Sequence, residues 1–271
     1  MVDATLAALA GLLGARSRRP RLVGLSGLQG SGKSTFAHQL AAAANLRGCA
    51  CVAFSLDDFY LGRSDRLRLA REVHPLLATR GVPGTHDLGL LHATLDALAT
   101  ATPTRPVRVP RFDKGRDTRM APSRWPHVMG PPRLVLFEGW CVGLPPQPAG
   151  ALRRPLNALE REEDRGGRWR AWVNAQLAGD YAAAWRRLDR LVLLQAPNHA
   201  VVARWRDEQE HALRRRAAPN AMDRATLRRF LMHTDRLGRH ALRALPARAD
   251  LRLMLDASRN VRAIRGPHMN A

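Results

Sequence analysis

The stretch GLQGSGKS, residues 27–34, constrains the fold of this chain more than any other sequence feature. It follows an apolar run, RLVGLS, and precedes a segment with helical periodicity, TFAHQLAAAANLRG. A strand, a glycine-rich loop and a helix in this order form a phosphate-binding loop, where backbone N–H groups and the helix dipole surround an anion. We therefore predict that this segment holds the phosphates of a nucleotide. The residues expected at the nucleotide are Gly27, Leu28, Gln29, Gly30, Ser31, Gly32, Lys33, Ser34 and Thr35.

Three side chains around this loop have predicted roles in phosphoryl chemistry. Lys33 is expected to bridge the β- and γ-phosphates of ATP, and the Ser34 hydroxyl to ligate Mg²⁺. Glu138 ends the apolar run RLVLFEG, where a carboxylate would lie beside the phosphate loop and orient the metal shell. A buried glutamate without a partner would be costly. We therefore predict Ser34 and Glu138 as the metal-binding residues.

Five short apolar runs are typical of strands buried on both faces of a parallel sheet. They alternate with segments of helical periodicity, which predicts a doubly wound α/β fold of the P-loop NTPase class. We expect a mostly parallel five-stranded sheet with helices on both faces and a helical lid. The predicted strands are 21–26, 49–55, 133–139, 190–196 and 251–257, and the predicted helices are 34–47, 64–73, 87–100, 168–188, 199–217 and 222–245.

The chain is predicted to form one domain, residues 1–271, because its length suits one large α/β core. Within it we expect a leading helix over 1–19, a loop on the acceptor side over 101–132, a helical insertion over 141–188 and a lid helix over 199–217. The segments 101–132 and 141–167 read as surface excursions, either solvated loops or the walls of an acceptor site.

The formal net charge of +21 invites a nucleic-acid interpretation. The arginines are scattered along the whole chain, however, and aromatic residues that could stack on bases make up only 5% of it. We therefore expect no nucleic-acid partner; acidic small molecules stay compatible with such a surface. Lys33 and Lys114 are the only two lysines, and a retained lysine among so many arginines suggests a position that needs a compact ammonium.

The cysteines and the N-terminal segment indicate the cellular compartment in which the protein is expected. Cys49, Cys51 and Cys141 form no CxxC pair, which favours a reducing environment. The N-terminal segment is too short to span a membrane, and its charges follow its apolar part, the reverse of a secretory signal. We expect a cytoplasmic protein without a membrane partner, and the oligomeric state stays open.

A pair of carboxylates, Asp57 and Asp58, follows the second predicted strand. Ligands of open α/β sheets bind beyond the carboxyl ends of the strands. Asp57 could therefore accept a proton from an attacking hydroxyl, and Asp58 could hold metal-bound water or cap the next helix. The alternative is that both are turn or capping residues.

The motifs GLSGLQGSGKST, SLDDFYL, HPLLATRGVPGTHD, VPRFDKGRD, LVLFEGWCVG, LNALEREED and WRDEQE occur in this order over roughly residues 20–260. This combination resembles the glycerate 3-kinase family, within the phosphoribulokinase and uridine kinase group of P-loop kinases. The resemblance implies transfer of the γ-phosphate of ATP, with Mg²⁺, to the 3-hydroxyl of D-glycerate. It also implies catalytic roles for Lys33, for the carboxylate of Asp57 and for Arg206 of a lid helix that reaches the phosphates.

The acceptor side of the resemblance rests on two motifs, RGVPGTHD and RFDKGRD. With Asp57, they imply substrate-binding roles for Arg80, His86, Asp87, Lys114 and Arg116. Four of them have a plainer interpretation: the arginines as surface residues, His86 as a satisfied loop histidine, and residues 114–116 as a solvated basic loop.

Two other functions stay open at this stage. A nucleoside or pantothenate kinase could use the same scaffold, since fold does not fix the acceptor. A regulatory NTPase associated with nucleic acid is the third hypothesis. The chain lacks an Asn-Lys-x-Asp guanine-reading motif and an LSGGQ run, so the basic surface is its only support.

Overall fold

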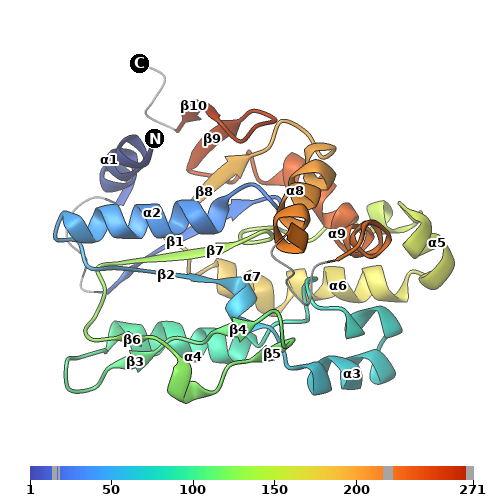
Figure 1. Ribbon diagram of the computed structural model, residues 1–271, viewed down its shortest axis with the longest axis horizontal. Helices are drawn as coiled ribbons and strands as arrows, with labels where there is room; N and C mark the ends of the chain where they lie inside the picture. Colours follow the sequence, from blue (N-terminus) through green and yellow to red (C-terminus); the bar gives the residue numbers. More distant parts are fainter. Residues whose placement is uncertain (14–16, 18, 216–221, 267–271) are drawn as a thin grey trace.

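A computed structural model describes residues 1–13, 17, 19–215 and 222–266 of the chain (Figure 1). Its centre is a six-stranded sheet in the order β10-β9-β8-β1-β7-β2. Five strands are parallel, and β10 pairs antiparallel with β9 at one edge. The strands are β1 (Arg21–Gly27), β2 (Cys51–Ser55), β7 (Leu134–Gly139), β8 (Arg190–Gln195), β9 (Leu251–Leu255) and β10 (Val261–Arg265).

The mostly parallel α/β sheet and its five predicted strands are confirmed, but the predicted strand number is wrong by one. The sixth strand, β10, has the sequence VRAIR, in which arginines interrupt the apolar residues. Its residues are half-buried or exposed, as suits an edge strand whose charges discourage pairing with another chain. No continuous apolar run marks such a strand.

Helices cover both faces of the sheet. α2 packs its buried Phe36, Ala37 and Leu40 toward β2 and β7, with α1 beside it, whereas α4 and α7 lie on the opposite side (Figure 1). The helices are α1 (Val2–Leu13), α2 (Lys33–Leu46), α3 (Arg63–Glu72), α4 (Leu88–Ala99), α5 (Ala158–Glu163), α6 (Arg168–Ala178), α7 (Asp180–Trp185), α8 (Val201–Arg215) and α9 (Arg224–Ala244). None of the helices in the described part of the chain is long and apolar enough to cross a membrane.

The predicted helices differ from the observed ones mainly at their ends. The predicted helix over 168–188 is two helices, α6 and α7, because the chain bends at Gly179. The leading helix ends at Leu13, and the last two residues of the predicted lid helix, 216 and 217, lie outside the described residues, as do 14–16 and 18.

The two predicted surface excursions have structure of their own. Residues 101–132 contain two pairs of short antiparallel strands, β3 (Val107–Arg108) with β6 (His127–Val128) and β4 (Phe112–Asp113) with β5 (Thr118–Arg119). Residues 141–167 are not all solvated, because α5 buries Leu159 and Glu160. Four short 3₁₀ helices complete the part of the chain that the structure describes: η1 (Leu56–Phe59), η2 (Pro75–Ala78), η3 (Pro122–Arg124) and η4 (Ala149–Leu152).

A buried ion pair fastens α5 to α9. The Arg236 guanidinium donates to both carboxylate oxygens of Glu160, at 2.7 and 2.6 Å, and to the carbonyl oxygens of Ala151 and Arg154. The two side chains are 9% and 0% exposed. On the same two helices, Arg229 pairs with Glu163, but both of these side chains are exposed.

These two pairs allow a matched stability test. Arg236→Met leaves the buried Glu160 carboxylate without its cation, so we expect the free energy of unfolding to fall by about 3–5 kcal/mol. Arg229→Met removes the same charge from the same helix at an exposed pair, and it should cost less than about 1 kcal/mol. Urea unfolding followed by tryptophan fluorescence checks both values. Equal losses for the two variants would contradict the assignment of a buried, paired role to Arg236.

Candidate active site

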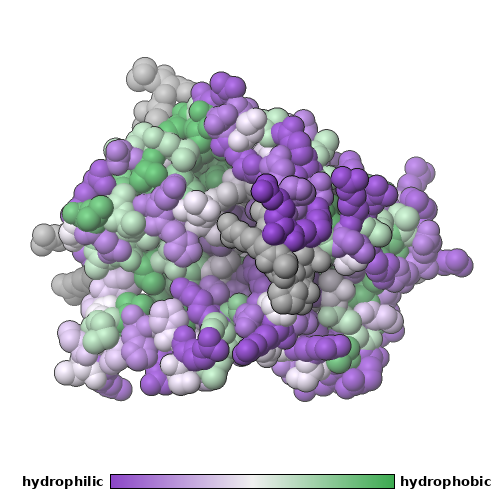
Figure 2. Space-filling view, viewed as in Figure 1, coloured by the Kyte–Doolittle hydropathy of each residue, from purple (hydrophilic) through white to green (hydrophobic). Residues whose placement is uncertain are grey.

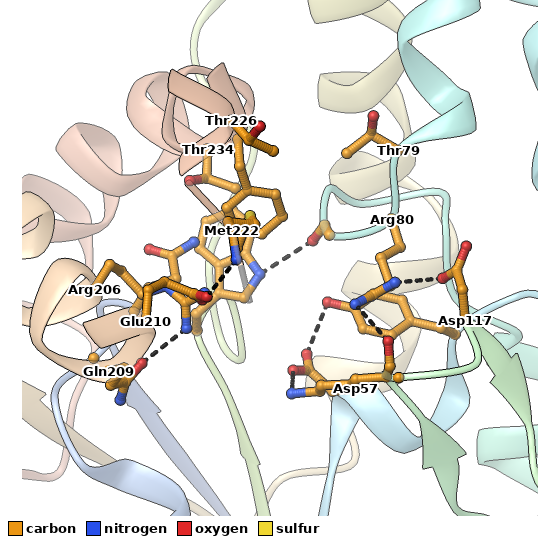
Figure 3. A pocket seen from close by; sticks show the side chains of 18 of the residues that line it. Asp57, Thr79, Arg80, Asp117, Arg206, Gln209, Glu210, Met222, Thr226 and Thr234 are labelled. Atoms are coloured by element: carbon orange, nitrogen blue, oxygen red, sulfur yellow. Dashed lines mark hydrogen bonds and ion pairs between the residues drawn. The ribbon is translucent and has the colours of Figure 1, made fainter. Parts of the chain in front are cut away.

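A cavity of about 1220 Å³ opens at the carboxyl ends of β1, β7 and β2. One wall carries side chains of α8 and α9, and the opposite wall carries residues 78–81 and the β4–β5 turn (Figure 3). Hydrophilic side chains gather over α8 on the face that Figure 2 shows. The strand register explains why the cavity lies at this edge of the sheet. Ser26 pairs with Gly139 and Ser55 pairs with Glu138, so the carboxyl ends of β1, β7 and β2 are level.

The floor of the cavity is the glycine-rich loop, residues 27–34. Gly30 and Gly32 have left-handed φ values of 81° and 86°, which glycine adopts without strain. A Cβ atom on Gly30 would also lie 2.6 Å from the Cβ of Trp205. α2 begins at Lys33 and has no side-chain cap at Gly32, so N–H groups of its first turn are available to an anion.

The predicted nucleotide-contacting residues divide into two groups. Six of them line the cavity: Gln29, Gly30, Gly32, Lys33, Ser34 and Thr35. Gly27, Leu28 and Ser31 are buried and do not line it.

Ser34 and Glu138 meet at the same end of the cavity. The Ser34 hydroxyl donates to Glu138 Oε1 at 2.6 Å. The other carboxylate oxygen, Oε2, is buried without a hydrogen-bond partner among the described residues. Hydroxyl and carboxylate oxygens are ligands of Mg²⁺, which commonly takes one or two protein oxygens and completes its shell with phosphates and water. The pair therefore fits such an ion, although the described residues contain no group of three or more His, Cys, Asp or Glu side chains that could hold a metal ion by itself.

Asp57 lies in η1, directly after β2, and faces the cavity. Its Oδ1 accepts from the Tyr60 hydroxyl at 2.9 Å, and its Oδ2 accepts from Lys114 Nζ at 2.6 Å. Burial opposes ionisation of this carboxyl, but the ammonium groups of Lys114 and then Lys33 outweigh it and hold the pKa of Asp57 below its ordinary value. The side chain is therefore a carboxylate at neutral pH.

Asp58 has a structural role. Its Oδ2 accepts from the Ser55 backbone N–H at 3.0 Å, while the Ser55 side chain accepts from the backbone in return, so the two residues form a capping box on η1. The structure supports a capping role for Asp58, but the capped helix is η1, in which Asp58 itself lies, and not the next helix.

Arg80 contributes to the wall of the cavity opposite α8. Its guanidinium pairs with Asp117 and donates to the Lys114 carbonyl oxygen at 3.2 Å. Arg66, which is 1% exposed, pairs with the other oxygen of Asp117 and donates to the carbonyl oxygens of Leu61 and Ala78. Two arginines thus share one carboxylate and fix this wall. The sequence gives no sign of Arg66, because a buried arginine looks like a surface one in so basic a chain.

His86, Asp87 and Arg116 do not line the cavity. The His86 ring is buried, with Nδ1 2.5 Å from the Tyr181 hydroxyl, and it stacks on Tyr60 at a ring-centroid distance of 4.5 Å. Burial lowers the pKa of His86 to about 4, so the ring is neutral at pH 7.

Asp87 caps α4 by accepting from the Leu90 N–H at 2.9 Å. The Arg116 side chain is exposed, and its guanidinium lies 3.9 Å from Asp113. The structure therefore places these two outside the cavity, and it places His86 behind Tyr60, where it supports the residue that contacts Asp57.

Arg206 of α8 lines the cavity opposite Arg80 (Figure 3). Its guanidinium donates to Gln209 at 2.8 Å and to Glu210 at 2.7 Å, and it lies over the Phe230 ring. Trp205, beside it, is fully buried and donates to the Ala257 carbonyl oxygen at 2.8 Å, which anchors the helix.

Comparisons with known proteins agree with this geometry. No family model matches the sequence. Over 219 residues the chain is 36% identical to an uncharacterized kinase, mug58, of Schizosaccharomyces pombe; the match covers 78% of this chain and 77% of that protein. It is 34% identical over 201 residues to the chloroplastic D-glycerate 3-kinase of Arabidopsis thaliana, covering 71% of this chain and 41% of that longer protein.

Among solved structures, D-glycerate 3-kinase from Cryptococcus neoformans matches with a TM-score of 0.76 and 25% identity over 98% of both chains. The extent of the yeast match, together with the sheet and the glycine-rich loop, leads to one conclusion. The chain belongs to the family of P-loop kinases that includes these D-glycerate 3-kinases, and it is a phosphotransferase.

Proposed function

We propose that the protein transfers the γ-phosphate of ATP to the 3-hydroxyl of D-glycerate. The observation that carries this proposal is that Lys33, Asp57 and Glu138, far apart in the sequence, line one cavity. The cavity is large enough for a nucleotide and a small acceptor together. Cations on the Asp57 side suit an acceptor that bears a carboxylate, and the relatives named D-glycerate 3-kinase support the choice of acid.

The nucleotide side of the site would bind the phosphates electrostatically. Backbone N–H groups of the glycine-rich loop and the N-terminal turn of α2 would surround the phosphates, as in a Walker A motif, and the Lys33 ammonium would contact the β- and γ-phosphates. Ser34 and Glu138 would hold Mg²⁺, which supplies positive charge that neutralises the charge developing during transfer. Arg206 would add its charge once it exchanges Glu210 for a phosphate oxygen.

The acceptor side would supply position and a base. Asp57 would orient the acceptor hydroxyl toward the γ-phosphorus and take its proton as the new P–O bond forms. Tyr60, stacked on the buried His86, would hold the Asp57 carboxylate in place. Positioning and electrostatics should supply most of the rate.

We also propose that the protein acts in the cytoplasm. Cys49, Cys51 and Cys141 are all free thiols in the structure, and Cys141 is fully buried, which supports a reducing compartment.

The role of Asp57 is testable by one substitution. Asp57→Asn keeps the shape of the side chain but removes its ability to accept a proton, so kcat should fall about 10²–10⁴-fold while ATP affinity stays near that of the wild type. The neighbouring Asp58→Asn keeps a capping side chain on η1 and should turn over normally. Coupled ADP release gives kcat, and calorimetry gives the Kd for ATP. An unchanged kcat in Asp57→Asn would remove this residue from the mechanism.

The acceptor can be identified with a small panel. We expect ADP release to be fastest with D-glycerate when it is compared with uridine, pantothenate and ribulose 5-phosphate. Uridine has no anionic group for the cationic wall, and the relatives named D-glycerate 3-kinase favour glycerate over the two other anionic acceptors. Phosphorus NMR of the product should show a 3-phosphate ester. Faster turnover of uridine or pantothenate would instead support the other kinase hypothesis.

The metal assignment predicts a specific defect. Glu138→Gln removes the charge of the carboxylate that meets Ser34, so the Mg²⁺ concentration for half-maximal turnover should rise about tenfold or more. The Mg²⁺ dependence of ATP protection against thermal unfolding gives a second readout. Glu163→Gln, at an exposed position on α5, is the control. Identical Mg²⁺ curves for Glu138→Gln and the wild type would contradict the role of Glu138.

A further inference from the structure

Both oxygens of the proposed base are occupied. Tyr60 donates to Asp57 Oδ1, and Lys114 Nζ lies 2.6 Å from Oδ2. The Lys33 ammonium also acts on this carboxylate from another element, and the buried His86 ring and Cys141 thiol lie nearby, but none of these three side chains makes a hydrogen bond to it. A carboxylate held by an ammonium is a poor proton acceptor, because the cation stabilises its charged form. The arrangement in the structure therefore opposes the chemistry proposed for Asp57.

Lys114 is the cation on this wall that is best placed to change partners. Arg66 and Arg80 are both held by Asp117. Lys114, in contrast, lies in the turn between β4 and β5, its side chain is 60% exposed, and its ion-pair partner in the described part of the chain is Asp57 alone. Its four-carbon stem can turn the ammonium into the cavity without a movement of the backbone.

We infer that the carboxylate of the acceptor takes Lys114 from Asp57 when it binds, so that the group that anchors the acceptor also frees the base. This inference rests on the proposed function. The exchange replaces one ion pair by another, and the charge on Lys114 stays neutralised throughout. An acceptor without a carboxylate would leave Asp57 paired and would be phosphorylated slowly even when it binds.

Phosphoryl transfer from ATP to the acceptor hydroxyl follows this exchange. The acceptor hydroxyl oxygen forms a bond to the γ-phosphorus, the bond between that phosphorus and the bridging oxygen breaks, and ADP leaves with the electron pair. The hydroxyl proton passes to the freed Oδ2 of Asp57 and later to water. Lys114 is a substrate-binding residue in this scheme, because its ammonium pairs with the acceptor carboxylate, while Asp57 takes the proton.

The test compares D-glycerate with glycerol, in which a hydroxymethyl group replaces the carboxylate. We expect Lys114→Met to lower kcat/KM for D-glycerate roughly ten- to hundredfold, as for the loss of one charge-assisted hydrogen bond. The same variant should raise kcat for glycerol about threefold or more, since Asp57 is then free without any carboxylate. A disruption of structure would lower both values and cannot produce this split.

Two further variants make the comparison firm. Arg124→Met removes the same charge at an exposed position in the same segment, and it should leave both acceptors at wild-type values. Lys114→Gln keeps a polar side chain of similar length and should reproduce the Lys114→Met pattern, so a folding failure of one variant leaves the other as the test.

The outcomes separate the two proposals. A glycerol kcat that is unchanged or reduced in both Lys114 variants, with a raised KM for D-glycerate, would make Lys114 an anchor only and overturn the exchange. A wild-type enzyme that turns over glycerol better than D-glycerate would overturn the proposed acceptor itself.

Discussion

The parallel pairing of β1, β7 and β2 is the constraint on which the rest of the structure depends. It sets Gly139 level with Ser26 and Glu138 level with Ser55, so three loops leave the sheet at one edge. The strand pairing thereby brings the glycine-rich loop, the Asp57 segment and Glu138 to one cavity. A one-residue slip of β7 would turn Glu138 to the other face of the sheet and separate it from Ser34.

The sequence was sufficient for the fold class and for the glycine-rich loop between its strand and helix. Continuous apolar runs predict the buried strands. The run Gly32-Lys33-Ser34 between a strand and a helix predicts a phosphate-binding loop, and this prediction depends on local geometry alone. The unusual retention of Lys114 also pointed to a residue that the structure places against Asp57. These signals are local or compositional, so a single sequence can carry them.

The wall of the cavity that carries Arg80 was harder to predict, because its residues act through long-range pairs. Arg66, Arg80 and Asp117 come from three segments, and nothing in their sequence neighbourhoods distinguishes a shared buried carboxylate from surface charges. The RGVPGTHD motif implied a binding role for His86, yet its ring packs behind Tyr60. The edge strand β10 was not predicted, because arginines interrupt its apolar residues. An edge strand can form with such a sequence, since it pairs with only one neighbour, here β9.

The contact between Trp205 and Gly30 limits how the helical wall of the cavity can rearrange. Arg259 adds to it, because its Nε donates to the Gly30 carbonyl oxygen while its guanidinium lies over the Trp205 ring. The first half of α8 is thus coupled mechanically to the loop that would bind the phosphates. A movement of α8 would therefore bend the helix beyond Trp205 or carry both elements together, and the backbone of Arg206 would stay at a nearly constant distance from Gly30.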